Sequence, residues 1–134
     1  MSEPNESGVA GGTSRKLAIA GWVVGVLPMA MLTLSSVMKF LAPPQAVDGF
    51  KHLGWNPSDA VVLGVVELSC VVLYLVPRTC VLGAILVTGY LGGAVATHAR
   101  LGEAWVIPVA LGVAAWLGLV LRDTRLRALL PLRG

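Results

Sequence analysis

Four long apolar segments dominate this chain of 134 residues, at positions 17–38, 59–76, 79–97 and 104–121, and three of them contain no charged side chain. Each is 18 to 22 residues long. At about 1.5 Å per residue, a helix of that length crosses a hydrocarbon core of about 30 Å. Only 13% of the residues are charged, against about 25% in soluble domains. The sequence therefore predicts an all-α, four-helix transmembrane bundle of up-and-down topology, with no room for a separate soluble domain.

The two ends of the chain differ from this apolar body. Residues 1–16 are polar, rich in Gly and Ser and free of aromatic side chains, which predicts a disordered tail. Residues 122–134 form a basic tail. The pair Arg15-Lys16 resembles the start of a signal peptide. However, the apolar run after it has 22 residues and ends without an A-x-A site, so we predict a transmembrane helix.

The distribution of basic residues predicts the orientation. With four spans, both ends of the chain share one side with the turn at Arg78. That side carries seven basic residues and the other side three, so we expect both termini in the cytoplasm. This clustering sets topology and contacts anionic lipid, and it argues against nucleic-acid binding. We therefore predict a multi-pass membrane protein with membrane lipids as partners.

A short segment between the first two spans has its own pattern. Val47, Phe50 and Leu53 recur at helical spacing with polar residues between them, and Gly54 can end the helix. This predicts an amphipathic helix at the outer surface or across the mouth of the bundle. Within the first span, Pro28 predicts a bend, because it removes one hydrogen bond of the helix.

Glycines recur at positions where close helix packing is expected. Gly21 and Gly25 in the first span, and Gly89 and Gly93 in the third, are four residues apart. Such pairs allow helix backbones to approach one another in membranes. Close packing is the ordinary function of these glycines, and also of Gly83 and Gly92.

Glu67 is the residue most indicative of a functional site. It lies near the middle of the second apolar segment, where a carboxylate costs a few kcal/mol. Counting along antiparallel spans places Thr88 and Tyr90 at the same depth, so their hydroxyls are expected partners. A buried glutamic acid can serve as a general acid or base or as a proton relay. Equally, it can be an interhelical hydrogen bond that only holds the helices together.

A second polar layer is predicted near the outer surface, where interface solvation and ion pairing are the ordinary explanation. Lys39 ends the first span, and its long stem can extend to the interface. The chain contains no H-E-x-x-H, C-x-x-C-H, P-loop or G-x-G-x-x-G pattern, so no metal site is predicted and the cofactor stays open. The remaining members of this layer are Thr97, His98, Arg100 and residues 48–52.

Residues 38–131 resemble the DoxX-like family of small bacterial four-helix membrane proteins. The run TGYLGGAVATHARLG at 88–102 is the most specific part of the resemblance. The other parts are Lys39-Phe40, Leu53-Gly54, Leu63-Gly64 with Glu67, Pro77-Arg78-Thr79, and Trp116 with Leu121-Arg122-Asp123.

The resemblance implies the same four-helix fold and a set of candidate site residues. Relatives in the wider superfamily include a subunit of a thiosulfate:quinone oxidoreductase, and more distant ones are sterol isomerases with intramembrane carboxylates. The family pattern matches at Lys39, Glu67, Arg78, Tyr90, His98 and Arg100. From the residues and the resemblance together, the candidate catalytic residues are Glu67, Tyr90 and His98, and the candidate substrate-binding residues are Lys39, Thr88 and Arg100.

Three functions stay open at this point. The first is a membrane subunit that handles a quinone or another lipophilic substrate, with Glu67 passing protons and Tyr90 orienting the ligand. The second is a non-catalytic component that binds lipid or holds a soluble or membrane partner through its basic tail. The third is a small isomerase or lyase with Glu67 as the acid/base group. A homo-oligomer is compatible with each. Only the family analogy favours the first function.

Overall fold

The computed structural model describes residues 9–130, which form helices joined by short turns and contain no strand. The elements in chain order are α1 (Val9–Leu41), α2 (Pro44–His52), the 3-10 turn η2 (Pro57–Asp59), α3 (Ala60–Leu75), α4 (Cys80–Arg100), α5 (Val106–Arg122) and α6 (Thr124–Leu129).

Three of the helical segments are long and apolar enough to cross a membrane. They cover Arg15–Leu41, Pro57–Leu75 and Cys80–Arg100, with lengths of 27, 19 and 21 residues. The fourth, α5, is also apolar but has only 17 residues, about 26 Å of helix and the lower limit for a span. The expectation of an all-helical chain with several membrane-capable helices is confirmed.

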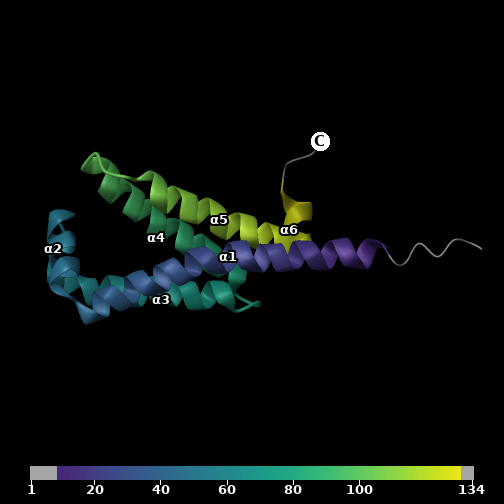
Figure 1. Cartoon of the computed structure of the whole chain (residues 1–134), viewed down its shortest axis with the longest axis horizontal. Helices are drawn as coiled ribbons and strands as arrows, with labels where there is room; N and C mark the ends of the chain where they lie inside the picture. Colours follow the sequence, from purple (N-terminus) through teal and green to yellow (C-terminus); the bar gives the residue numbers. More distant parts are fainter. Residues whose placement is uncertain (1–8, 131–134) are drawn as a thin grey trace, which may run out of the picture.

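Each long helix packs against two others. Helix α1 contacts α3 and α5, and α4 contacts the same two helices. Figure 1 shows that α4 and α5 separate from α1 and α3 toward the end of the molecule where α2 lies. At the opposite end the helices converge, and the start of α1 projects beyond them.

Glycines permit the close approach at the converging end. A methyl group on Gly118 of α5 would come within 2.5 Å of the Cα atom of Gly25 in α1. One on Gly83 of α4 would come within 2.2 Å of the backbone nitrogen of Tyr74 in α3. We call this region, with Gly21, Gly25, Tyr74, Gly83, Gly118 and Arg122, the glycine end.

The glycines farther along α4 behave differently. A methyl group on Gly89, Gly92 or Gly93 would meet no atom within 4 Å. The close-packing prediction is therefore confirmed for Gly21, Gly25 and Gly83 and is wrong, within this chain, for these three. The reason is helix rotation: the buried residues Val87 and Leu91 define the packed face of α4, and the three glycines lie off it.

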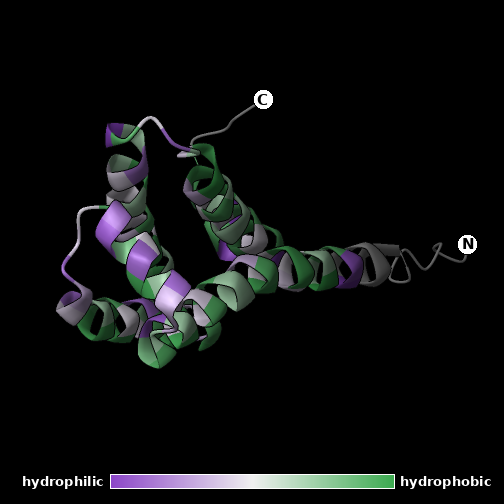
Figure 2. Ribbon diagram, turned by 60° about the vertical axis from the view of Figure 1, so that its left-hand side comes forward, coloured by the Kyte–Doolittle hydropathy of each residue, from purple (hydrophilic) through white to green (hydrophobic). Residues whose placement is uncertain are grey.

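The outer faces of the long helices are apolar, as lipid contact requires. Val23, Val62 and Val113 are each more than 60% exposed. Figure 2 shows mainly hydrophobic residues along the long helices and a cluster of hydrophilic ones on α2. The buried centre is made chiefly by large or close-packed side chains, among them Met29, Leu32, Tyr74, Val87 and Leu119.

Helix α2 confirms the predicted short helix and lies across the ends of α1 and α3 (Figure 1). Gly54 follows its last turn with a φ of +82°, a conformation that favours glycine. Two contacts connect this region to the turn between α4 and α5. Arg100 Nη2 donates to the Leu53 carbonyl over 2.9 Å, and His52 pairs with Glu103.

The predicted boundaries of the tails need correction. Helix α1 begins at Val9, so residues 9–16 are helical and not part of a disordered tail. Extending an existing helix costs far less than nucleating one, and no proline stops it here. Residues 1–8 lie outside the described range. In the basic tail, Asp123 accepts a hydrogen bond from the Arg125 backbone and starts α6. Residues 131–134 also lie outside the range.

Candidate functional site

Glu67 lies on the packed face of α3 and is 1% exposed. Gly64, Cys70, Val71 and Tyr74 share that face at spacings of three and four residues, and all are buried. The helical periodicity thus places one carboxylate on the same face as a series of buried and mostly apolar residues. A buried carboxylate needs partners, because an unpaired charge in such surroundings is very costly.

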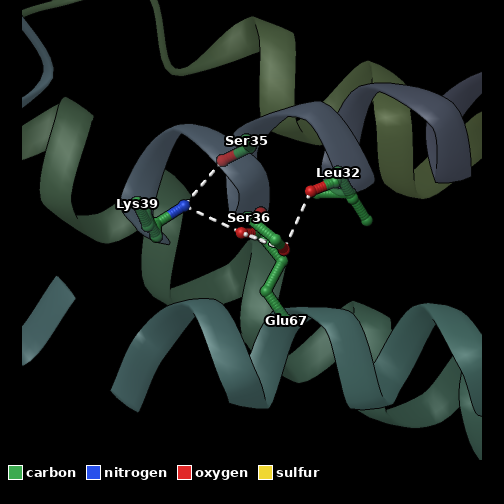
Figure 3. Close-up of polar contacts among 5 residues, drawn as sticks. All are labelled: Leu32, Ser35, Ser36, Lys39 and Glu67. Carbon is green, nitrogen blue, oxygen red and sulfur yellow. Dashed lines mark hydrogen bonds and ion pairs between the residues drawn. The ribbon is translucent and has the colours of Figure 1, made fainter. Parts of the chain in front are cut away.

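Two side chains of α1 supply those partners (Figure 3). Lys39 Nζ lies 2.8 Å from Glu67 Oε2 and forms an ion pair with it. The Ser36 hydroxyl lies 3.0 Å from the same oxygen and is completely buried. Lys39 also donates to the Ser35 hydroxyl over 2.6 Å. One oxygen of Glu67 therefore accepts from two donors that belong to a single helix.

The Lys39 side chain reaches Glu67 because of how α1 and α3 are placed. Side chains on a helix point back toward its N-terminus, so Lys39 Nζ lies one turn below its own Cα, beside Ser35. Gly64 of α3 leaves room for Phe40 and the Lys39 Cβ atom, which lie within 3.3 Å of where its own Cβ would be. The prediction that Lys39 extends to the interface is therefore wrong, and its side chain is only 15% exposed.

Tyr90 of α4 lies beside this ion pair. Lys39 Nζ is 5.9 Å from the centroid of the Tyr90 ring, close enough for a cation–π interaction. Tyr90 therefore lies near Glu67 through their shared neighbour Lys39, and its predicted bond to Glu67 and its role in catalysis stay predictions.

Three other candidates lie elsewhere. Thr88 donates to the Ala84 carbonyl and accepts from Trp116 Nε1, each over 2.8 Å, so it is not a partner of Glu67. Counting residues gives the depth of a side chain but not its direction around the helix. His98 Nδ1 bonds to the Ala94 carbonyl over 2.8 Å, and Arg100 is the exposed contact to the α2 region. Within the described range, none of the three forms a hydrogen bond or an ion pair with Lys39 or Glu67.

Ser36 is the member of the site that sequence reasoning missed. It follows the buried residues Met29 and Leu32 at helical spacing, so it belongs to the packed face of α1. It also lies three residues before Lys39, one turn away. A hydroxyl on an apolar face, one turn before the lysine that ends the span, is a signal that could have identified it.

A pocket opens beside the ion pair, at the end of the molecule where α2 lies. We call this the pocket end. Its volume is about 180 Å³, and it lies between the end of α1, helix α2 and the start of α3. Seven apolar residues and two polar ones line it: Met38, Ala42, Ala46, Val47, Phe50, Pro57 and Ala60, with Ser35 and Lys39.

The arrangement connects the pocket to the buried carboxylate. A lysine ammonium has three N–H donors, and among the described residues two of them serve Ser35 and Glu67. The third has no partner among the described residues, and Lys39 is one of the residues that line the pocket. The 2.8 Å contact is also short enough for a proton to pass between Lys39 Nζ and Glu67 Oε2. The chemistry that these groups offer is hydrogen bonding to an oxygen acceptor and proton exchange between Lys39 and Glu67.

Comparison with known proteins supports one assignment. No curated protein and no solved structure matches the chain. A family model, the DoxX-like family, matches residues 23–120, which include Ser36, Lys39, Glu67 and Tyr90. The match covers far more than half of the sequence and confirms the resemblance seen in its motifs. The chain belongs to the DoxX-like family.

Proposed function

We propose that this protein is a membrane component that holds a small lipophilic molecule in the pocket end and exchanges a proton with it through Lys39 and Glu67. The observation that carries the proposal is the position of Lys39, which lines the pocket and lies 2.8 Å from the buried Glu67 carboxylate. An ion pair serving only to join helices has no need to line a cavity.

The size of the pocket limits the ligand. A cavity of about 150 Å³ holds a benzene molecule, so about 180 Å³ accommodates one substituted ring. The apolar lining favours a ring without charge, and the lysine favours an oxygen acceptor on it. A quinone head group has both properties, with its tail extending into the lipid. Electrons for its reduction would come from a partner subunit.

Ser36 supports the proton-handling role. Its hydroxyl lies 3.0 Å from both Glu67 Oε2 and the Leu32 carbonyl, but it has one proton to donate. When Glu67 is ionised, Ser36 can donate to the carboxylate. When Glu67 is protonated, the acid can donate to Ser36, which then donates to Leu32. Both protonation states of Glu67 keep their hydrogen bonds, and such a group can gain and lose a proton without a large rearrangement.

The membrane placement is also part of the proposal. The four long helices cross an inner membrane as an up-and-down bundle, with both ends of the chain in the cytoplasm. The separation of seven basic residues from three supports this orientation. The pocket end then faces the outer side. Helix α5 is short for a span, and local thinning or the interfacial Trp105 accommodates the difference.

One observation favours assembly with a further chain. Gly89 and Gly93 form a pair whose face is open in this chain, and such pairs join transmembrane helices closely. A second copy or a membrane partner subunit can pack there. A purely structural component that binds lipid and assembles through α4 is therefore the second candidate function.

Binding of a short-chain quinone analogue, decylubiquinone, to the purified protein tests the first candidate. We expect quenching of tryptophan fluorescence with a defined dissociation constant, because Trp55 lies close to Phe50 of the pocket, with ring centroids 6.4 Å apart. Lys39→Met should weaken binding by about tenfold or more, the effect of losing a hydrogen bond to a charged group. Lys51→Met, an exposed lysine of α2, is the matched control.

The proton step has its own test. Glu67→Gln keeps the size and the hydrogen-bonding capacity of the side chain, so the fold and ligand binding should survive. In the complex with the partner subunit that supplies electrons, proton-coupled turnover should fall by about 10²-fold, as is usual for a lost acid or base. Asp48→Asn controls for the loss of any carboxylate at this end. Equal binding by wild type and Lys39→Met, or full turnover by Glu67→Gln, would remove this function and leave the structural one.

A further inference from the structure

At the glycine end, Arg122 of α5 is held in an unusual position. Its guanidinium group lies 4.0 Å from the ring centroid of Trp22 in α1 and 4.9 Å from that of Tyr74 in α3. Nη2 donates to the Tyr74 carbonyl over 3.3 Å. Nη1 is buried and has no hydrogen-bond partner among the described residues. The stacking on the two rings fixes the orientation of the guanidinium group, and its Nη1 donor is left without an acceptor among the described residues.

A second arginine nearby in the chain shares this property. Helix α6 folds back after Asp123, and its Leu126 packs against the buried core. Arg127 Nε, one residue further, is also buried without a partner in the described range. A buried donor on a charged group destabilises the folded protein when it is unpaired. Two such donors, five residues apart in the chain, indicate that an acceptor outside the described residues completes this part of the molecule.

The charges at this end define that acceptor. The two ion pairs of the described residues, Lys39–Glu67 and His52–Glu103, both lie at or near the pocket end. Near the glycine end, Asp123 is an acidic residue among several cations. Its carboxylate accepts a hydrogen bond from the Arg125 backbone at the start of α6. The described cations on this side are Arg15, Lys16, Arg78, Arg122, Arg125 and Arg127.

Position adds the last requirement. Arg122 is the final residue of an apolar helix, and Trp22, which stacks on it, is 40% exposed. Tryptophan prefers the level of the lipid head groups. Arginine binds phosphate oxygens with two N–H groups in a plane. We propose that Arg122 and Arg127 bind the phosphate group of an anionic phospholipid at the glycine end. This site is separate from the pocket and does not depend on the function proposed for it.

Thermal stability of the full chain in dodecyl maltoside tests this site. Dioleoylphosphatidylglycerol should raise the melting temperature by about 4 °C or more, because a ligand that binds only the folded state stabilises it. Dioleoylphosphatidylcholine carries a balancing cation and should have little effect. Inorganic phosphate lacks the acyl chains and should also have little effect.

Variants locate the effect. Arg127→Gln should remove at least half of the shift caused by phosphatidylglycerol, and Arg122→Gln should remove nearly all of it. Arg78→Gln, an exposed cation in the turn before α4, is the control and should keep the full shift. If Arg122→Gln fails to fold, Arg127→Gln alone decides. Three results would overturn the site: equal shifts from phosphatidylcholine, equal shifts from inorganic phosphate, or equal losses in Arg78→Gln and Arg127→Gln.

Discussion

The glycine end and the pocket end are built from the same four helices, but different contacts join the helices at each. At the glycine end, backbones touch with no side chain between them, as at Gly25 and Gly118. At the pocket end, helices α1 and α3 are joined by an ion pair and separated from α4 and α5 (Figure 1). We therefore expect the glycine end to be rigid, because its backbones are in direct contact. We expect the pocket end to adapt to a ligand, because its helices leave a cavity. A ligand site needs the space of the pocket end, and the contacts of the glycine end hold the helices around that space in place.

Replacing Gly83 should have the largest effect, because the contact it makes is between two backbones. Gly83→Ala places a methyl group within 2.2 Å of the Tyr74 nitrogen, and α3 and α4 must move apart. We expect a loss of about 3 kcal/mol, the upper range for overpacking, measured by unfolding in detergent. Gly89→Ala makes the same chemical change in open space on the same helix. If both variants were equally unstable, the glycine end would not be the rigid end.

Breaking the ion pair at the pocket end should cost less. Glu67→Leu leaves Lys39 without its carboxylate, but that lysine is 15% exposed and can turn toward the pocket. A loss of about 2 kcal/mol is expected, the upper range for interhelical hydrogen bonds in membranes. Adding Lys39→Met should restore part of it, because the unpaired charge is then gone. A double mutant as unstable as the sum of the single ones would mean that the two residues are not coupled.

Removing the Ser36 hydroxyl should have a smaller effect again. Ser36→Ala deletes one donor to Glu67 and leaves the lysine in place. The expected loss is about 1 kcal/mol, typical of one hydrogen bond. Ser69→Ala is the matched control, because this exposed serine of α3 bonds only to a carbonyl of its own helix. We expect no measurable change in stability there, and a similar loss in both would argue against a special role for Ser36.

The smallest effect concerns Ala42, which follows α1 and lines the pocket. Its φ of +44° is unfavourable for a residue with a side chain, by about 1 kcal/mol. Ala42→Gly relieves this strain but makes the unfolded chain more flexible, so a net gain of about 0.5 kcal/mol is expected. Ala46→Gly, the same change inside α2, should instead lower stability by nearly 1 kcal/mol. Chemical denaturation of both variants measures this difference. Changes of opposite sign in the free energy of unfolding would confirm that the turn at Ala42 is strained.

The sequence was sufficient for the helices and for the central residue of the site. Apolar runs of spanning length identify membrane helices, and a carboxylate near the middle of one of them identifies Glu67. Both are local properties, which a single chain displays directly. The match to the DoxX-like family over residues 23–120 agrees with the motifs that suggested it.

The partners of Glu67 could not be obtained the same way. Which side chains meet depends on the rotation of each helix about its axis and on how far one helix is displaced along another. Neither quantity follows from the depth of a residue. Depth therefore predicts Thr88 as a partner of Glu67, although its hydroxyl bonds to Ala84 and Trp116, and it gives no sign of Ser36. The glycine pairs show the same limit, because the pattern of Gly89 and Gly93 matches that of Gly21 and Gly25 but has no neighbour opposite.

Pro28 divides α1 into two parts, and a change of bend there moves the part that carries Lys39. Pro28 is buried within the helix, and the hydrogen bond it cannot form makes the helix easiest to bend at that point. Figure 1 shows α1 changing direction along its length. The arm from Pro28 to Lys39 spans 11 residues, about 16 Å. Turning this arm by about 6° displaces its tip by roughly 1.7 Å, which takes the 2.8 Å contact with Glu67 beyond hydrogen-bonding distance. The charge pair can thus open by elastic bending alone, with every helix still folded.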